Sequence, residues 1–580
     1  MLDRRTDQAR FEQMHADGSW WTGKAPSECA GWVGATGSSP AWLSSLALPS
    51  LGAPTSTTRQ QTLDYFENTW ALTELLFSAL RDEAAFYLPP YHQLRHPLIF
   101  YYGHVAALYV NKLRLAEVLD APINGGYEAQ LFEVGVDEMS WDDLSQTSPS
   151  WPPLEEVHAY RRKVYAAVRK VIESHPALAE GSGPIEIDDP LWALFMAFEH
   201  ERIHLETSSI LMRELPAPLV RTPLGWPRRH ASAPAADRFV PVAGEDYPRN
   251  PMQTVPAARV ELGKPRESRS FSWDNSYGQV TRDVDEFSAS RYKVSNGEFL
   301  EFVKDGGYHD KQYWTAEGWG WRVFRNVKWP TFWTSVGPAG KHEYRLRTTF
   351  EVLPMPWSWP AEVNSHEARA FCSWRSARDG TPYKLQSEAQ SVRLRGDATT
   401  ATGGGDAAPT DPVMVSRGDE IATKHGLNLN LAFSTPWPVD SSHGGVHGAF
   451  GDVMGSVWEW CEEVFYPLPG FEVSPLYDDF SAPCFDGQHR MIVGGSYIST
   501  GDMASIWARF HFREHFHQSA GFRLASSSAT AATASSAATA ATSSAATAAD
   551  TSAPADTSAT AAPKASSTAS VDSRGMSYES

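Results

Sequence analysis

Apolar residues recur every three to four positions in four segments between residues 56 and 215. The segments are TLDYFENTWALTELLFSALRDEAAFYL, HPLIFYYGHVAALYVNKLRLAEVL, VHAYRRKVYAAVRKVIESH and DDPLWALFMAFEHERIHLETSSILMREL. This spacing puts the apolar side chains on one face of a helix. Asp188 and Asp189 ahead of Pro190 are typical of a helix start. Four amphipathic helices of this length predict a four-helix bundle over residues 56–215.

The pattern changes on both sides of this helical region. Residues 216–252 are rich in proline and predict a linker. In residues 253–525, short apolar runs alternate with Trp, Gly and turn clusters such as DGGYHDK, which predicts an α+β domain. Residues 1–55 are rich in Gly, Pro and Ser and predict a flexible extension. Residues 526–580 are almost entirely Ala, Ser and Thr, which bury too little apolar surface to fold, so a disordered tail is expected.

Composition narrows the class of protein. The formal net charge of −19 argues against a nucleic-acid binder or a protein of anionic membranes. No apolar run approaches the roughly 20 residues that cross a bilayer, and the first residues lack the apolar core of a signal peptide. The four cysteines lie far apart, which is untypical of a disulfide framework and fits a reducing compartment. We therefore expect a cytoplasmic, multidomain protein that uses neither nucleic acid nor membrane as a partner.

The segment EHERIHLE carries the sharpest local motif. His200 and His204 are four residues apart, which places both imidazoles on one face of a helix, where they can share a metal. The same residues match HExxH, the motif of zinc hydrolases. Arg202 inside the motif, and Thr207 and Ile210 where the elongated motif has Gly and His, argue against a protease. A zinc hydrolase remains a remote alternative.

A third histidine strengthens the case for a metal. His104 lies in FYYGHVAAL on the same helical stripe as Phe100 and Leu108, so it should face the bundle interior. Three neutral imidazoles without a cysteine leave coordination positions open, which is typical of a catalytic site for zinc, iron or copper. The spacing alone does not choose among these metals. Histidines that only pack within the helices are the alternative.

Longer blocks carry a resemblance to a known family. TLDYFENTWALTELLFSAL, RHPLIFYYGH, LFEVGVDEMSWDD and EHERIHLETSS resemble the DinB-like domain of 5-histidylcysteine sulfoxide synthases, the enzymes of ovothiol biosynthesis. SRYKVSNGEFLEFVKDGGY, DVMGSVWEW, FYPLPGFEVSPLYDDF, VGGSYISTGD and ARFHFREHFHQSAGFR resemble their formylglycine-generating-enzyme-like domain, which has a C-type-lectin-like fold. The resemblance covers roughly residues 56–525.

The resemblance implies an iron-dependent oxidoreductase. Its metal ligands would be His104, His200 and His204, and its cofactor Fe(II). The implied substrates are L-cysteine, L-histidine and O2, and the product is 5-histidylcysteine sulfoxide. Forming the C–S bond and oxidising the sulfur each release two electrons, and O2 accepts all four, so no further reductant is needed.

The resemblance also implies two residues beyond the metal ligands. A tyrosine near the EEVFYPLPGF block supplies a proton or hydrogen atom in related synthases, which makes Tyr466 the catalytic candidate. In ergothioneine-pathway relatives this tyrosine stands one position earlier, where this chain has Phe465. Asp502 in STGDMAS matches a substrate-binding aspartate. Packing of Tyr466 as one more aromatic, and a turn-capping role for Asp502, are the simpler alternatives.

Other functions remain open at this point. An ergothioneine-type synthase would act on trimethylated histidine, hercynine, at the C2 carbon. A formylglycine-generating enzyme would need a close cysteine pair, which the stretch from Trp507 to Leu524 lacks. A DinB-like binding module would do no chemistry. Because family members usually carry a methyltransferase domain, we expect a separate methyltransferase and a C–S lyase to complete the pathway.

Overall fold

The computed structural model describes residues 8–37, 39–52, 56–92, 94–133, 150–395, 426–442 and 449–527. The predicted tail beyond residue 527 and the LFEVGVDEMSWDD block from Val134 onward lie outside the described residues.

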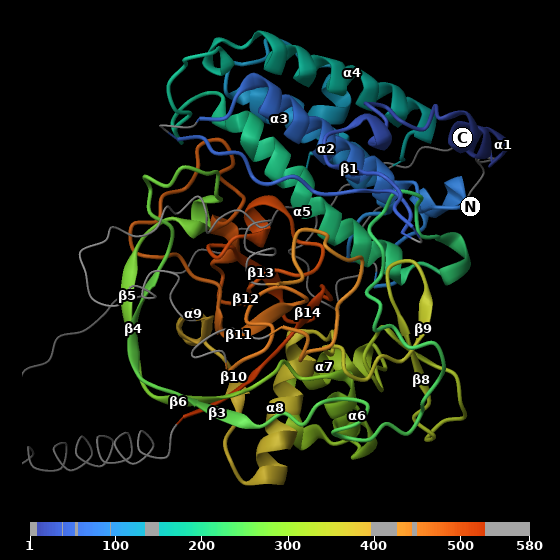
Figure 1. Ribbon diagram of the computed structural model, residues 1–580, viewed down its shortest axis with the longest axis vertical. Coiled ribbons are helices and arrows are strands. Elements are labelled where there is room, and N and C mark those ends of the chain that lie inside the picture. The colour runs from blue at the N-terminus through green and yellow to red at the C-terminus, as the bar shows by residue number, and fades with distance from the viewer. Residues whose placement is uncertain are drawn as a thin grey trace, which may run out of the picture. The chain divides into compact units, whose positions relative to one another are not determined.

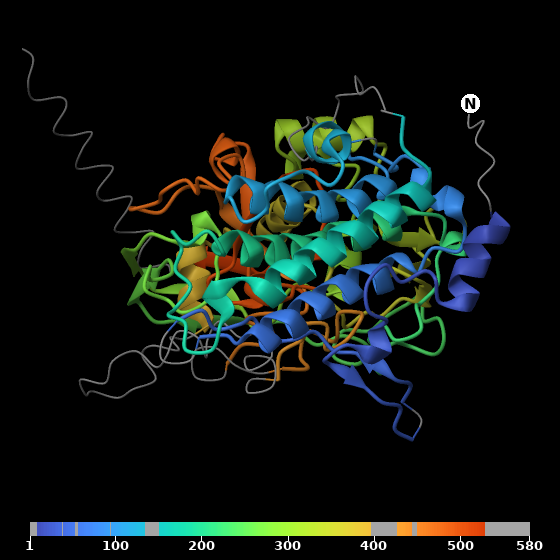
Figure 2. The ribbon, with the colours of Figure 1, turned by 90° about the horizontal axis from the view of Figure 1, so that it is seen from above.

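Four long helices form the amino-terminal domain and match the four predicted segments. They are α2 (Arg59–Phe77), α3 (Leu98–Leu115), α4 (Leu154–Ser174) and α5 (Trp192–Glu214). The helices α2 and α3 each pack against both α4 and α5 (Figure 1), and the four lie side by side when seen from above (Figure 2). At the start of α2, the Thr58 side chain accepts from the Gln61 amide, and the Gln61 side chain accepts from the Thr58 amide. This capping box satisfies two of the helix's terminal donors.

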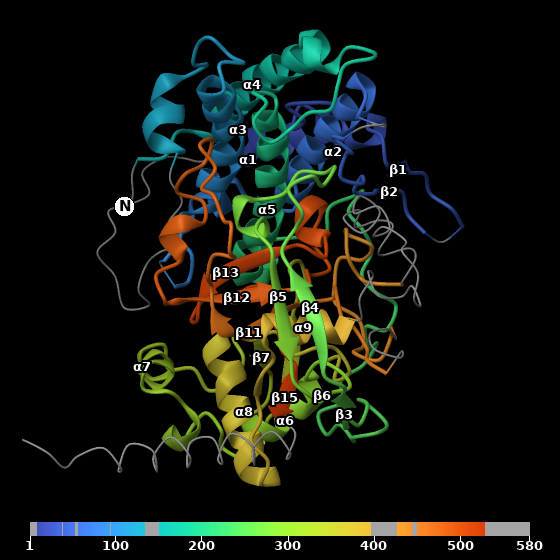
Figure 3. The same ribbon diagram turned by 90° about the vertical axis from the view of Figure 1, so that its left-hand side faces the viewer.

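Burial differs sharply between the helices. On α4, buried residues follow the three-to-four spacing and the opposite face is exposed, as an outer helix requires. On α5, nearly every residue from Trp192 to Arg213 is buried. The reason is visible in Figures 1 and 3, where α5 lies between the other helices and the second domain. Of the helices in the described part of the chain, none is long and apolar enough to span a membrane.

The predicted flexible extension is wrong for the described residues between 8 and 52. This segment forms α1 (Gln8–Asp17) and the short strands β1 (Trp32–Val33) and β2 (Trp42–Leu43). The Trp20 side chain is 1% exposed, stacks on Tyr102 and donates its indole N–H to the Glu74 carbonyl, 3.0 Å away. The segment is ordered despite its Gly, Pro and Ser residues. Burial of the large Trp20 side chain stabilises the folded segment by more free energy than those residues lose in conformational entropy.

The second domain contains short helices and mixed sheets, as the α+β prediction required. Its helices are α6 (Asn296–Lys304), α7 (Ala316–Phe324), α8 (Ser365–Asp379) and α9 (Glu388–Arg395). Its strands are β3 (Met252–Val255), β4 (Ala258–Leu262), β5 (Val280–Val284), β6 (Phe287–Ser290), β7 (Trp333–Ser335), β8 (Tyr344–Arg347), β9 (Val352–Pro354), β10 (Lys384–Leu385), β11 (Trp458–Val464), β12 (His489–Val493), β13 (Arg509–Arg513), β14 (Ala520–Gly521) and β15 (Leu524–Ser527).

Two four-stranded sheets organise these strands. One has the order β10-β15-β6-β3 and the other β13-β12-β11-β14. All pairs are antiparallel except β11 with β14. The sheet that contains β11 to β13 is the one nearer to α5 (Figures 1 and 3). The strand β15 also includes Ser526 and Ser527, the first residues of the predicted tail.

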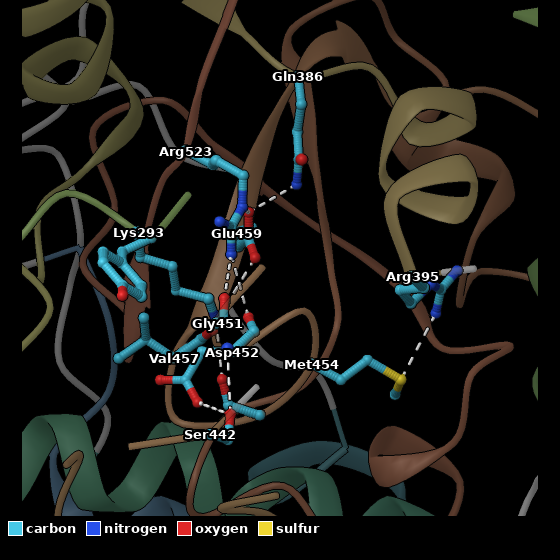
Figure 4. A network of polar contacts seen from close by, with 12 residues as sticks. Lys293, Gln386, Arg395, Ser442, Gly451, Asp452, Met454, Val457, Glu459 and Arg523 are labelled. Carbon is cyan, nitrogen blue, oxygen red and sulfur yellow. Dashed lines mark hydrogen bonds and ion pairs between the residues drawn. The ribbon is translucent and has the colours of Figure 1, made fainter. Parts of the chain in front are cut away.

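A buried ionic network fixes the centre of the second domain (Figure 4). The Glu459 carboxylate on β11 lies 3.6 Å from Lys293 and 3.4 Å from Arg523, and accepts from Gln386 at 2.6 Å. Both cations are completely buried. Lys293 also donates to backbone carbonyl oxygens of residues 455 and 457, the loop that leads into β11. The Glu459 carboxylate therefore pairs with two buried cations, for which the buried Asp452 is a second counter-charge, and the contacts of Lys293 hold this loop in place.

We predict that Glu459→Ala lowers the free energy of unfolding by about 3–5 kcal/mol, because it removes the carboxylate that pairs with two buried cations. Asp283→Ala is the control, since it removes one member of the exposed Arg259–Asp283 pair on β4 and β5 and should leave stability essentially unchanged. Urea denaturation followed by tryptophan fluorescence gives both values. Equal effects of the two substitutions would contradict a dominant role of the network.

Candidate metal centre

The structure brings the three predicted histidines together at one point. His104 comes from α3, and His200 and His204 come from consecutive turns of α5. One ring nitrogen from each lies within 4.8 Å of the other two, and the Nε2 atoms of His200 and His204 are 3.1 Å apart. His104 and His200 are buried and His204 is part-buried. Three converging imidazoles form a set that can hold one metal ion.

A backbone contact orients His104 within this set. Its Nδ1 donates to the Phe132 carbonyl oxygen at 2.7 Å. Since a carbonyl only accepts, the proton lies on Nδ1, and Nε2 carries the lone pair. The Phe100 ring stacks on the same imidazole, with ring centroids 4.8 Å apart. Such fixing of the ring and of its tautomer is typical of metal-binding histidines.

Burial favours the neutral form of His200 and of His204. Burial lowers the pKa of His200 and of His204 well below the ordinary value, and the neighbouring imidazoles lower each further. Each of these two rings therefore keeps one unprotonated nitrogen near neutral pH, which can bind a cation without first releasing a proton.

The HExxH motif does not form a hydrolase site. Glu201, which would be the general base, is completely buried and accepts from the Tyr109 hydroxyl at 2.7 Å. Its other oxygen lies 3.8 Å from Arg161. Both oxygens of the Glu201 carboxylate therefore interact with side chains of the helical core. The residues of the HExxH match serve the packing of the helices. The geometry gives no support to the zinc hydrolase.

One tyrosine of the second domain lies beside the histidines. The Tyr477 ring centroid is 6.0 Å from that of His200, and the Lys112 ammonium lies 3.6 Å from the centre of the Tyr477 ring. Tyr477 also lines a cavity of about 120 Å³ whose wall includes Met196 and Trp192, which lie one and two turns ahead of His200 on α5. Tyr477 thus lies next to His200 and also forms part of the wall of this cavity.

The predicted catalytic Tyr466 lies in another environment. Its hydroxyl donates to Glu388 at 2.7 Å, and the Arg509 guanidinium, paired with Glu388 at 2.6 Å, lies 5.1 Å from its ring centre. The contacts described for Tyr466 do not include the three histidines. Sequence reasoning therefore missed Tyr477, which stands in the same FYPLPGFEVSPLYDDF block. Two tyrosines in one irregular segment cannot be ranked by spacing.

The predicted substrate-binding Asp502 is also completely buried. Its amide donates to Glu199 at 2.7 Å, and its carboxylate accepts from Ser272 at 2.5 Å. Glu199 precedes His200 on α5 and also accepts from Tyr65 at 2.6 Å. The observed contacts of Asp502 therefore hold α5 against the second domain. Its role in binding a substrate stays a prediction.

Two family models match the two domains. Residues 65–208 match the DinB superfamily, and residues 243–528 match the sulfatase-modifying factor enzyme 1-like domain. This two-domain architecture agrees with the predicted order of a helical domain followed by an α+β domain.

Curated relatives match from 46% to 76% of the chain. The "Hercynine oxygenase" of Mycobacterium tuberculosis is 30% identical over 46% of this chain and 58% of its own length. The protein of that name from Mycolicibacterium smegmatis is 28% identical over 60% of this chain and 72% of its own. "Ergothioneine biosynthesis protein 1" of Neurospora crassa is 22% identical over 76% of this chain and 54% of its own. The chain is homologous to these proteins, and it spans little more than half the length of two of the three.

We predict that His200→Ala weakens Fe(II) binding by more than about 100-fold, because it removes one of three ligands where a change in the surrounding shell alone costs about 10–100-fold. His175→Ala, at the end of α4 and outside the cluster, should bind as the unsubstituted chain does. Anaerobic competition against a chromophoric Fe(II) chelator measures both. Tight binding by the His200 variant would exclude this centre.

Proposed function

We propose that the protein is an Fe(II)- and O2-dependent sulfoxide synthase, which joins a cysteine sulfur to an imidazole carbon and oxidises that sulfur to the sulfoxide. The observation that carries the proposal is the convergence of His104, His200 and His204 in a homologue of hercynine oxygenases. Iron held by these imidazoles would supply the coordination sites at which thiol, imidazole and O2 meet.

The protein side of the reaction consists of holding, orienting and excluding water. Three imidazoles leave part of the coordination sphere to substrates. The hydrogen bond to the Phe132 carbonyl oxygen orients His104, and the hydrogen bond from the Asp502 amide to Glu199 holds α5 against the second domain. Burial of the cluster keeps bulk water away from the reacting atoms. Electrons balance without a further reductant, since the two oxidations release four and O2 accepts four.

We place the proton-donating role on Tyr477. Its ring lies next to His200, whereas Tyr466 is engaged with Glu388. A tyrosine beside the metal centre could deliver a proton to oxygen as it is reduced. Lys112, packed over the Tyr477 ring, holds this side chain in position through a cation–π contact.

We predict that Tyr477→Phe lowers kcat for sulfoxide formation by about 100-fold or more, in line with the loss of a general acid. Tyr466→Phe, the matched substitution in the same block, should change kcat by less than about threefold. Stopped-flow and steady-state assays on the iron-loaded enzyme give both values. The reverse order of effects would restore the role to Tyr466.

For the imidazole substrate, the relatives favour the ergothioneine-type alternative over the ovothiol-type prediction. Their names refer to hercynine and ergothioneine, and none of those reported above refers to ovothiol. The cavity beside Tyr477 supports the same choice. Aromatic side chains (Trp192, Trp273, Tyr277, Tyr477 and Phe480) and carboxylates (Asp188, Asp274 and Glu472) line it together with Arg266. Aromatic faces and carboxylates attract a trimethylammonium group, and a guanidinium suits the carboxylate of the same zwitterion.

A product assay tests the function and the substrate together. We expect cysteine and hercynine, with Fe(II) and O2, to give a sulfoxide joined at the imidazole C2, and histidine to react at a kcat/KM at least about tenfold lower. Mass spectrometry and NMR of the product identify the thiol, the imidazole and the carbon attacked. Preference for histidine with attack at C5 would restore the ovothiol-type reaction. Absence of any coupled product, or turnover without O2, would refute the synthase itself.

A further inference from the structure

A second cluster of metal-binding residue types lies within the second domain. Cys484, His489 and His511 each place one ligand atom within 4.8 Å of the other two, and all three side chains are buried. Cys484 ends the short 3₁₀ helix η9 (Ala482–Cys484), His489 begins β12, and His511 lies in the middle of β13. None of these residues belongs to the histidine centre between α3 and α5.

Strand register explains how the two histidines meet. The strands β12 and β13 pair antiparallel, with His489 opposite Arg513 and Met491 opposite His511. Residues 489 and 491 point to one face of the sheet, so His489 and His511 are diagonal neighbours on that face. Their ring centroids are 5.2 Å apart and the rings are nearly perpendicular, at 88°. The chain ahead of β12 then carries Cys484 onto the same face.

His511 is the observation that points to a ligand. Its side chain is 9% exposed, and neither ring nitrogen has a hydrogen-bond partner among the described residues. One face of its ring stacks on Phe465, with centroids 4.3 Å apart. An imidazole buried with both nitrogens unsatisfied is costly, and such a group calls for an ion or water at its edge.

His489 already has the arrangement of a metal ligand. Its Nδ1 lies 3.0 Å from the Asp486 carboxylate, so Nδ1 carries the proton and Nε2 carries the lone pair. A carboxylate behind the imidazole is the usual support of a metal-bound histidine, since it fixes the tautomer and strengthens the donor. Asp486 is part of the turn that joins η9 to β12, so the support and the ligands come from one short stretch of chain.

We propose that Cys484, His489 and His511 bind a transition-metal ion of the zinc class. One thiolate and two imidazoles exclude Mg²⁺ and Ca²⁺, which require oxygen ligands, and suit Zn²⁺. The ion would tie the loop that ends at Cys484 to the β12–β13 face. The same loop carries Tyr477, so this site fastens the segment that presents the tyrosine to His200. The proposal does not depend on the reaction catalysed at the histidine centre.

Cobalt titration of the full-length, metal-free protein under anaerobic conditions tests the site directly. The histidine centre holds no thiolate, so Co²⁺ bound there gives only weak ligand-field absorption. Co²⁺ bound to Cys484 adds an intense thiolate-to-cobalt charge-transfer band, which Zn²⁺ should abolish on displacing the cobalt. We expect the band to correspond to one Co²⁺ at this site and to reach its maximum by two Co²⁺ per chain in total, because the histidine centre binds the other. Its absence from the unsubstituted protein would overturn the proposal without any variant.

Variants assign the band to its residues. Cys484→Ser should abolish it, and His511→Gln should weaken Co²⁺ binding at this site by more than about tenfold. Cys461→Ser is the matched control, because Cys461 is buried in the same apolar cluster as Cys484 but is not one of the grouped ligands. His200→Ala should keep the band and lose the ligand-field absorption of the other site. A band that survives Cys484→Ser, or disappears in Cys461→Ser alone, would contradict the assignment.

Discussion

The burial of α5 is the constraint on which the rest of the structure depends. A helix covered on every side must find a partner for each polar side chain, because an unpaired charge in the interior costs several kcal/mol. The second domain supplies several of these partners. Arg213 makes two hydrogen bonds to Glu362, at 2.7 and 2.8 Å, and Glu206 accepts from the Trp458 indole at 2.7 Å. The helix that carries two of the three clustered histidines is therefore held in rotation and in register by another domain.

This arrangement divides the proposed chemistry between the domains. All three imidazoles belong to helices of the first domain, while Tyr477 and most of the neighbouring cavity wall belong to the second. The ionic network around Glu459 stabilises the sheet that faces α5, since it fixes the loop leading into β11. A substitution deep in the second domain can therefore displace α5 and change the metal centre without replacing any of the three histidines.

Sequence reasoning succeeded where function follows from regular geometry. The spacing of His200 and His204 on a helix, and the stripe that includes His104, were enough to predict a cluster that the structure then places within 4.8 Å. It failed where irregular chain decides position. Tyr466 and Tyr477 occupy one loop-rich block, and only the path of the backbone shows which of them approaches His200. His489 and His511 are separated in the sequence and meet through the register of β12 and β13, which no local pattern encodes.

The Trp20 anchor has a consequence for where the first domain begins. Thr22, two residues further on, donates its amide to the buried Glu74 carboxylate at 3.0 Å, on the same helix whose backbone receives the Trp20 indole. The segment ahead of α2 therefore fills part of the interior that α2 would otherwise expose. A fragment cut at the first helix of the family match would lose a piece of its own core. The smallest autonomous folding unit of this domain is accordingly longer than the homologous region that defines it.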